Sequence, residues 1–156
     1  MTSRAKLEAP QAADGNPYER DFYTWAMQQA TLLREGRFDE LDVENVAEEI
    51  EDLGKEQARA LRSSYRLLLV HLLKWQHQRR RRSRSWAGTI VRERQNAALG
   101  IEDNPGLKSQ QRDLFLQAYQ LARKEAAAET GFPLVTFPET CPYALEQALD
   151  EAFWPG

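Results

Sequence analysis

The stretch LLLVHLLKWQHQRRRRSRSW, Leu67–Trp86, joins two segments of opposite character. Its first part, Leu67–Trp75, is apolar at almost every position, so a helix here must be covered on most sides and belongs to the middle of a packed core. Its second part, Gln76–Trp86, places five arginines within six positions. In a chain whose formal net charge is -3, this cluster must either meet an anion or be neutralised by the protein's own acidic groups.

Length and composition are those of one soluble globular domain. No run approaches the roughly 18 consecutive apolar residues that a membrane span needs, so we expect no membrane partner. Residues 1–16 are polar and lack the apolar core of a signal peptide, which predicts a disordered tail ahead of a single domain over residues 17–156. Cys141 is the only cysteine, which excludes an internal disulfide and favours a reducing, cytoplasmic setting.

Helix-start residues recur along the whole chain. The predicted starts are Asn16-Pro17, Asp42, Ser83 or Ser85, Asn104-Pro105 and Pro142. No proline occurs between Asp42 and Gln78. This stretch therefore predicts one long central helix from about Val43 to about Gln78, roughly 50 Å long at 1.5 Å per residue. No segment with strand-like spacing is longer than Leu134–Phe137. The prediction is an all-α helical bundle of four main helices, one of them long and central, plus a short C-terminal helix.

Six strings stand out in order along this helical framework. They are YERDFYTW (18–25), FDELD (38–42), EEIEDLG (48–54), HLLKWQ (71–76), RSRSW (82–86) and FPETCPY (137–143). Together they resemble the bacterial family catalogued as domain of unknown function 29, over essentially all of Tyr18–Pro155. The resemblance implies a compact helical bundle and brings no activity, cofactor or catalytic residue with it. The family pattern often has fewer arginines just before Arg82, so Arg79–Arg81 are partly particular to this chain.

The arginine run is the first candidate site. Arginine forks bind phosphate oxygens bidentately, and Trp75, Trp86 or His77 could stack on bases, which favours RNA or DNA as the anion. The alternative is structural, because cations at the C-terminal end of the long helix complement its dipole and some arginines could pair with the acidic helices. The anion-binding candidates are Arg79, Arg80, Arg81, Arg82 and Arg84, of which the last two are the better suited to internal pairing.

The second candidate is a polar site around His71, which lies within the apolar run. It would also contain Glu48, Glu49 and Asp52 if these carboxylates faced inward. The alternative is that the carboxylates are solvated or salt-bridged, and that His71 is a buried histidine that donates to a backbone carbonyl. The Glu-x-x-His pairs of di-iron bundles are absent from the sequence. We therefore predict no metal ligands and no cofactor.

Familiar catalytic motifs are also absent: the chain has no phosphate-cradling glycine loop and no serine-nucleophile elbow. Its charge is segregated, with carboxylates crowded between Glu44 and Glu56 and arginines crowded near residue 80. These patterns favour a non-catalytic protein-binding or adaptor module, acting on a protein partner or by self-association of its acidic and basic ends. A small RNA- or DNA-binding protein that uses Arg79–Arg84 is the alternative, and an enzyme with a site around His71 is the second.

Overall fold

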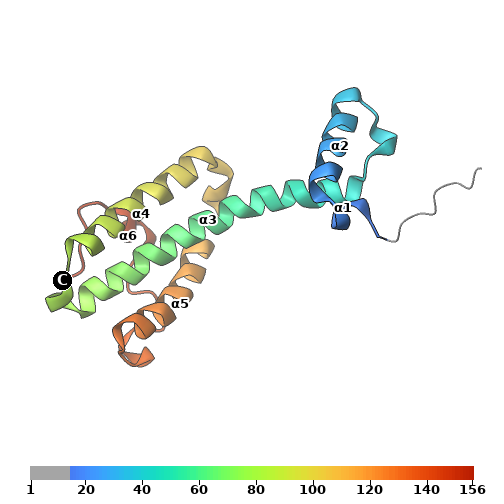
Figure 1. Ribbon diagram of the computed structural model, residues 1–156. Coiled ribbons are helices and arrows are strands. Elements are labelled where there is room, and N and C mark those ends of the chain that lie inside the picture. Colours follow the sequence, from blue (N-terminus) through green and yellow to red (C-terminus); the bar gives the residue numbers. More distant parts are fainter. Residues whose placement is uncertain (1–14) are drawn as a thin grey trace, which may run out of the picture. The chain divides into compact units, whose positions relative to one another are not determined.

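The computed structural model describes residues 15–156; of the predicted tail, residues 1–14 lie outside this range. Within the described chain, all regular structure is helical (Figure 1). The α-helices are α1 (Pro17–Arg20), α2 (Phe22–Glu35), α3 (Val43–His77), α4 (Arg84–Asp103), α5 (Gln111–Thr130) and α6 (Leu145–Leu149). Short 3-10 helices are η1 (Phe38–Glu40), η2 (Arg79–Arg81), η3 (Pro105–Gln110) and η4 (Leu134–Thr136). The predicted all-α fold with one long central helix is confirmed.

The predicted helix starts at Asn16, Asp42 and Ser83 are confirmed, because α1, α3 and α4 begin at the next residues. The other two are wrong: Asn104-Pro105 opens η3, so that α5 begins only at Gln111, and the last helix begins at Leu145, after Pro142.

The side-chain oxygen of Asn16 accepts a hydrogen bond from the backbone N–H of Tyr18 in α1, and the Ser83 hydroxyl accepts one from the N–H of Trp86 in the first turn of α4, both at 3.2 Å. Gly36 ends α2 in the left-handed conformation, at a φ of 70°. The first predicted helix is nevertheless divided at Asp21, whose carboxylate accepts from the N–H of Thr24 at 3.0 Å. An aspartate that bonds to the backbone in this way starts a new helix instead of continuing the old one.

The described chain forms two compact units, of which the first ends at Glu51 and the second begins at Asp52. The boundary falls inside α3, so this helix contributes its first turns to one unit and the rest to the other. The single domain expected over residues 17–156 stays a prediction.

The first unit is organised around one tryptophan. Among residues 15–51, Trp25 is the single buried side chain. The rings of Tyr18 and Phe22 pack against it, with ring centroids 4.7 and 5.6 Å from its own. Its indole N–H donates to a carboxylate oxygen of Asp42 at 3.0 Å, and the backbone N–H of Asp42 donates to Gln29 at 2.8 Å. These contacts hold α1, α2 and the start of α3 together.

The second unit is built on the apolar part of α3. Five residues of the stretch Leu67–Trp75 are completely buried: Leu68, Leu69, Val70, Leu72 and Leu73. In Figure 1, α4 runs back along α3 in the opposite direction, and α5 runs beside α3 in the same direction. Between α3 and α5, the rings of Tyr65 and Phe115 meet edge to face at 5.5 Å, and Arg66 forms an ion pair with Glu125. The part of α3 that is apolar nearly all round is therefore the part that the neighbouring helices cover.

Candidate functional site

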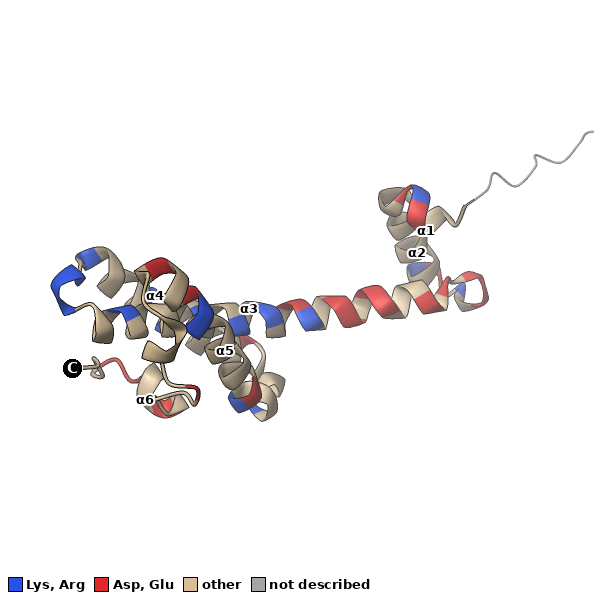
Figure 2. Ribbon diagram, turned by 90° about the horizontal axis from the view of Figure 1, so that it is seen from below, with Lys and Arg blue, Asp and Glu red and all other residues tan. Residues whose placement is uncertain are grey.

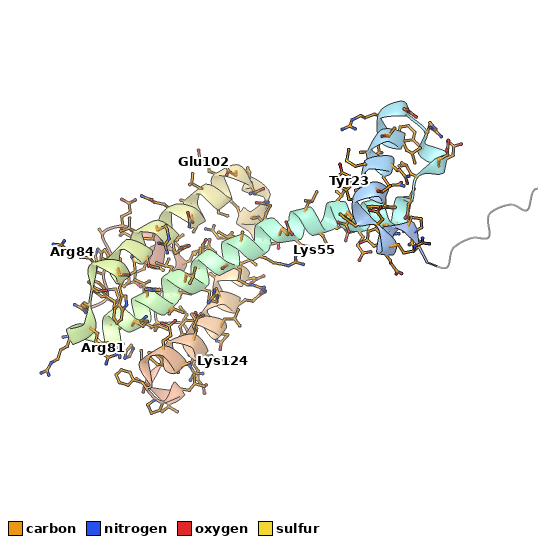
Figure 3. All side chains as sticks on the ribbon, viewed as in Figure 1. Tyr23, Lys55, Arg81, Arg84, Glu102 and Lys124 are labelled. Atoms are coloured by element: carbon orange, nitrogen blue, oxygen red, sulfur yellow. The ribbon has the colours of Figure 1, made fainter. Side chains whose placement is uncertain are left out.

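The structure separates the five arginines of the predicted basic site. Arg79, Arg80 and Arg81 form η2 and are exposed, as is Arg84 in the first turn of α4, whereas Arg82 is partly buried. Basic residues gather at this turn in Figure 2, and in Figure 3 the side chains of Arg81 and Arg84 point away from the bundle. A 3-10 helix has three residues per turn, so consecutive side chains leave it about 120° apart. The three arginines of η2 therefore diverge.

Arg82 is turned toward the protein. Its Nε donates to the carbonyl of Trp75 at 2.8 Å, and its Nη2 donates to the carbonyl of Pro155 at 3.2 Å. The guanidinium also lies over the Trp75 ring, 5.0 Å from the ring centroid. This side chain ties the end of α3 to the last residues of the chain, and its partners are backbone carbonyls, not the carboxylates of the acidic helices.

A second arginine, which the sequence analysis missed, holds the same C-terminal segment. Arg94 of α4 is only 3% exposed. Its Nε donates to the carbonyl of Ala148 at 2.8 Å and its Nη2 to the carbonyl of Phe153 at 2.6 Å, while the guanidinium lies 5.5 Å from the ring centroid of Trp154. Burial lowers the pKa of Arg94 from its usual value. Arg94 and Arg82 thus both bond to backbone carbonyls of the C-terminal segment.

The rings that could stack on bases already make internal contacts. Trp75 packs against Trp154, with ring centroids 4.8 Å apart. The ammonium group of Lys74 lies over the Trp86 ring at 4.5 Å from its centroid. The imidazole of His77 packs edge-on against a buried phenylalanine, with ring centroids 4.9 Å apart. These contacts make the three rings part of the second unit's packing.

A groove of about 530 Å³ opens beside η2, and we call it the η2 groove. Its lining residues are Gln76, His77, Gln78, Arg79, Arg80, Arg81, Thr130 and Phe132, none of which is acidic. Partial burial lowers the pKa of His77, so its imidazole is neutral near neutral pH. The positive charge of the η2 groove therefore comes from its arginines.

The residues of the predicted polar site are not brought together. Asp52 and His71 are 19 positions apart on α3, which is about 28 Å at 1.5 Å per residue. Asp52 forms an ion pair with Lys55 at 3.4 Å, Glu49 accepts from a tyrosine hydroxyl of α1, and Glu48 is exposed. Among residues 15–156, no three His, Cys, Asp or Glu side chains are grouped so that they could hold a metal ion.

His71 is partly buried and bonded to its own helix. Its Nδ1 lies 2.8 Å from the carbonyl of Leu67, so that nitrogen carries a proton and donates it. Burial lowers the pKa of His71, and the positive charges of Lys74 and Arg92 act in the same sense, whereas Glu129 raises it. The neutral imidazole is therefore the form that the folded protein favours.

This preference predicts a loss of stability in mild acid. The pKa of His71 is lower in the folded chain than its ordinary value of 6.5, so below about pH 6.5 the unfolded chain takes up the proton first and is favoured. We expect the denaturant midpoint to fall between about pH 7.5 and about pH 5.5, and to fall less in a His71→Gln variant. His77 titrates in the same sense, so the double variant His71→Gln/His77→Gln should respond least. Equal losses in all three proteins would contradict the assignment.

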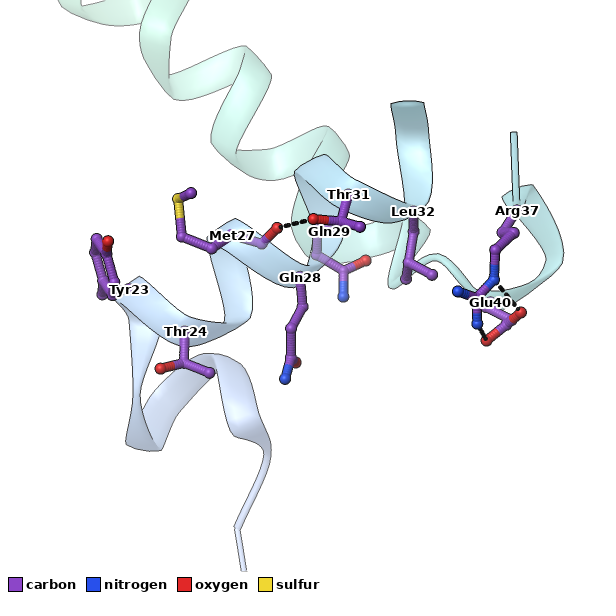
Figure 4. Close-up of a pocket in the computed structure, with 9 residues that line it drawn as sticks. All are labelled: Tyr23, Thr24, Met27, Gln28, Gln29, Thr31, Leu32, Arg37 and Glu40. Carbon is purple, nitrogen blue, oxygen red and sulfur yellow. Dashed lines mark hydrogen bonds and ion pairs between the residues drawn. The ribbon is translucent and has the colours of Figure 1, made fainter. Parts of the chain in front are cut away.

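A further groove, of about 700 Å³, follows α2 in the first unit (Figure 4), and we call it the α2 groove. Its lining residues are Tyr23, Thr24, Met27, Gln28, Gln29, Thr31, Leu32, Arg37 and Glu40. Tyr23 and Met27, one helical turn apart, are 74% and 50% exposed. Toward the η1 end, Arg37 donates to both carboxylate oxygens of Glu40, at 2.8 and 2.6 Å. None of these residues was a candidate predicted from the sequence.

The first unit exposes many apolar side chains for its size and is strongly acidic. Its half-exposed or more exposed large apolar residues include Phe22, Tyr23, Met27, Phe38, Val43 and Ile50. Residues 15–51 contain ten Asp and Glu against three Arg, a formal charge of -7. Many of these carboxylates lie along the first turns of α3 (Figure 2). Apolar surface and negative charge therefore occur together on this unit.

A known protein family matches nearly the whole chain. The family described as "Domain of unknown function DUF29" matches residues 17–154. The chain belongs to this family. Membership in DUF29 confirms the resemblance expected from the six strings. No curated protein and no solved structure matches the chain. In residues 15–156 of this DUF29 chain, no helix combines the length and the apolar composition needed to cross a membrane.

Proposed function

We propose that this protein is a non-catalytic protein-binding module whose α2 groove takes an amphipathic helix with basic flanking residues from a partner protein. The observation that carries the proposal is the exposure of Tyr23 and Met27, which form an apolar ridge one turn long on the rim of that groove. Tyrosine and methionine are enriched in the cores of protein interfaces, and methionine adapts readily to the shape of a partner. Exposed apolar surface on so small a unit is typical of an interaction site.

The charge of the first unit supports the choice of partner. A unit with a formal charge of -7 attracts a basic segment at long range and repels an acidic one. Apolar residues on one face of the bound helix would cover Tyr23 and Met27, while its lysines or arginines would lie near the carboxylates of η1 and α3. A cytoplasmic setting, expected from the single cysteine Cys141, belongs to this proposal as well.

A designed peptide provides the test. The probe is a fluorescein-labelled helical peptide with leucines on one face and lysines on the other, titrated by anisotropy near physiological salt. We expect it to bind, and we expect the variant Tyr23→Ser/Met27→Gln to bind at least tenfold more weakly, a loss of about 1.4 kcal/mol or more. Val91→Gln, which changes an exposed apolar residue of α4 instead, should bind like the unaltered protein.

Two further peptides separate the contributions of shape and charge. A peptide of the same composition, scrambled so that the leucines no longer share a face, should bind weakly, and a leucine–glutamate peptide should not bind. Equal binding of the scrambled peptide, or unchanged binding by the Tyr23→Ser/Met27→Gln variant, would contradict the proposal. A second copy of the chain is the alternative occupant of the α2 groove, and sedimentation at several concentrations tests it. If the unaltered protein forms a dimer and the Tyr23→Ser/Met27→Gln variant does not, a second copy fills the groove.

A further inference from the structure

The η2 groove has the opposite charge character from the α2 groove and is not used by the proposed function. We infer that it binds the sugar–phosphate backbone of a nucleic acid, largely without regard to base sequence. The residues that carry this inference are the three arginines of η2, with Gln76 and Phe132 beside them. The inference rests on the second unit alone and does not depend on the proposed function.

The positive charge at η2 is part of a net basic second unit, and within residues 15–156 the ion pairs do not include Arg79, Arg80 or Arg81. Residues 52–156 contain sixteen Lys and Arg against twelve Asp and Glu, a formal charge of +4. Two carboxylates of the helices beside η2 are already engaged, because Glu129 pairs with Lys74 at 2.7 Å and Glu93 with Arg92 at 3.1 Å. Among the described residues that line the η2 groove, there is no acidic side chain. An external anion is therefore a suitable partner for these arginines.

The geometry of η2 favours a polyanion over a single phosphate group. Consecutive side chains on a 3-10 helix diverge by about 120°, so one phosphate cannot satisfy Arg79, Arg80 and Arg81 together. A nucleic-acid strand carries a negative charge about every 3.4 Å along the helix axis, which offers each guanidinium a phosphate of its own. The exposed Arg84, in the first turn of α4, extends the same basic surface.

Gln76 adds a neutral donor to the groove. Its side-chain oxygen accepts a hydrogen bond from the hydroxyl of Tyr143 at 2.5 Å. Because the oxygen is occupied in this way, the amide N–H groups are the part of Gln76 that remains for a ligand, and N–H groups suit an anion. The buried tyrosine thus orients a donor beside the arginines.

The aromatic residues indicate that the bases contribute little. Trp75, Trp86 and His77 are engaged in internal contacts, and Phe132 is the aromatic side chain of the groove that is more than a third exposed. One such ring can stack on a base, but sequence reading needs several contacts with base edges. Phosphate contacts should therefore supply most of the affinity.

The experiment is an anisotropy titration of the whole protein with labelled single-stranded RNA, single-stranded DNA and duplex DNA, at low and near-physiological salt. We expect affinity to fall steeply with salt, since each neutralised phosphate releases counterions. The variant Arg79→Gln/Arg80→Gln/Arg81→Gln should bind at least tenfold more weakly, with a log–log salt slope smaller by about 2–3. The matched control Arg59→Gln/Lys108→Gln/Arg112→Gln removes the same charge elsewhere in the second unit. It should keep the affinity and the salt slope of the unaltered protein.

Two results would overturn the inference directly. One is that none of the three nucleic acids binds at low salt, and the other is that the two triple variants lose the same amount of affinity. Tight binding of tripolyphosphate that displaces the strand at equal phosphate concentration would identify a compact phosphate ligand instead. Equal binding of polyglutamate would identify an acidic protein segment. The Tyr23→Ser/Met27→Gln variant should bind nucleic acid normally, so that failure of the protein-binding proposal and failure of this one can be told apart.

Discussion

Replacing Arg94 with methionine is expected to lower the free energy of unfolding by about 3–5 kcal/mol. Methionine keeps much of the aliphatic stem but removes the charged donors that bond to the carbonyls of Ala148 and Phe153. Hydrogen bonds to a charged group contribute about 1.5–3 kcal/mol each, and both acceptors would be left without this partner. The guanidinium also covers the Trp154 ring, and that contact would be lost too.

Chemical denaturation followed by circular dichroism measures this loss. The matched control is Arg84→Met, in the first turn of α4, whose side chain is exposed. We expect that control to change the stability by no more than about 0.5 kcal/mol. Because Trp154 belongs to the segment that Arg94 holds, the tryptophan fluorescence of the protein should also shift in the Arg94→Met variant. A cost below about 1 kcal/mol, with unchanged tryptophan fluorescence, would show that the segment is held without Arg94.

Replacing Phe137 with alanine should cost a similar amount, about 3–5 kcal/mol. Phe137 is fully buried although it lies in the irregular segment between α5 and α6. Its ring packs edge-on against His77 at the end of α3, and its backbone carbonyl accepts from Arg123 of α5 at 2.9 Å. Removing the ring leaves a cavity between these elements, which the helices can close only partly.

The conservative variant isolates the effect of volume. Phe137→Leu fills most of the same space and should cost less than about 1.5 kcal/mol. Thermal unfolding of the two variants beside the unaltered protein gives the comparison, with the alanine variant expected to melt well below the leucine variant. Equal melting temperatures for the two would mean that the segment after α5 does not seal the core.

The long central helix could be predicted because its causes are local. An Asp cap, an uninterrupted proline-free stretch and an apolar run such as Leu67–Trp75 act within a few turns of chain. The helix that follows Ser83 and the end of the first helical segment at Gly36 were predictable for the same reason. The division at Asp21 was missed, because Pro17 and the apolar spacing both favour one continuous helix and only the carboxylate of Asp21 opposes it.

The roles of the arginines could not be read from their spacing. Arg82 stands in an unbroken basic run with Arg81, yet it bonds to backbone carbonyls while Arg81 is exposed. Its acceptors, at residues 75 and 155, are distant from each other in sequence, and carbonyls are the same at every position. Arg94 lay at helical spacing from the apolar residues Ile90 and Ala97, which was a signal of an inward position. The sequence around Arg94 did not indicate which carbonyls would accept its hydrogen bonds, because they lie more than 50 positions away.

Local patterns along the chain thus predict which segments are helical, where α1, α3 and α4 start, and which stretch of α3 lies in the core. Those features depend on backbone preferences and on apolar periodicity, which act over a few residues. The tertiary structure alone shows that Tyr23 and Met27 line a groove, that the predicted stacking rings are occupied, and which arginines face outward. These properties arise when segments distant in sequence either cover a side chain or leave it exposed, and no short stretch of sequence contains that information.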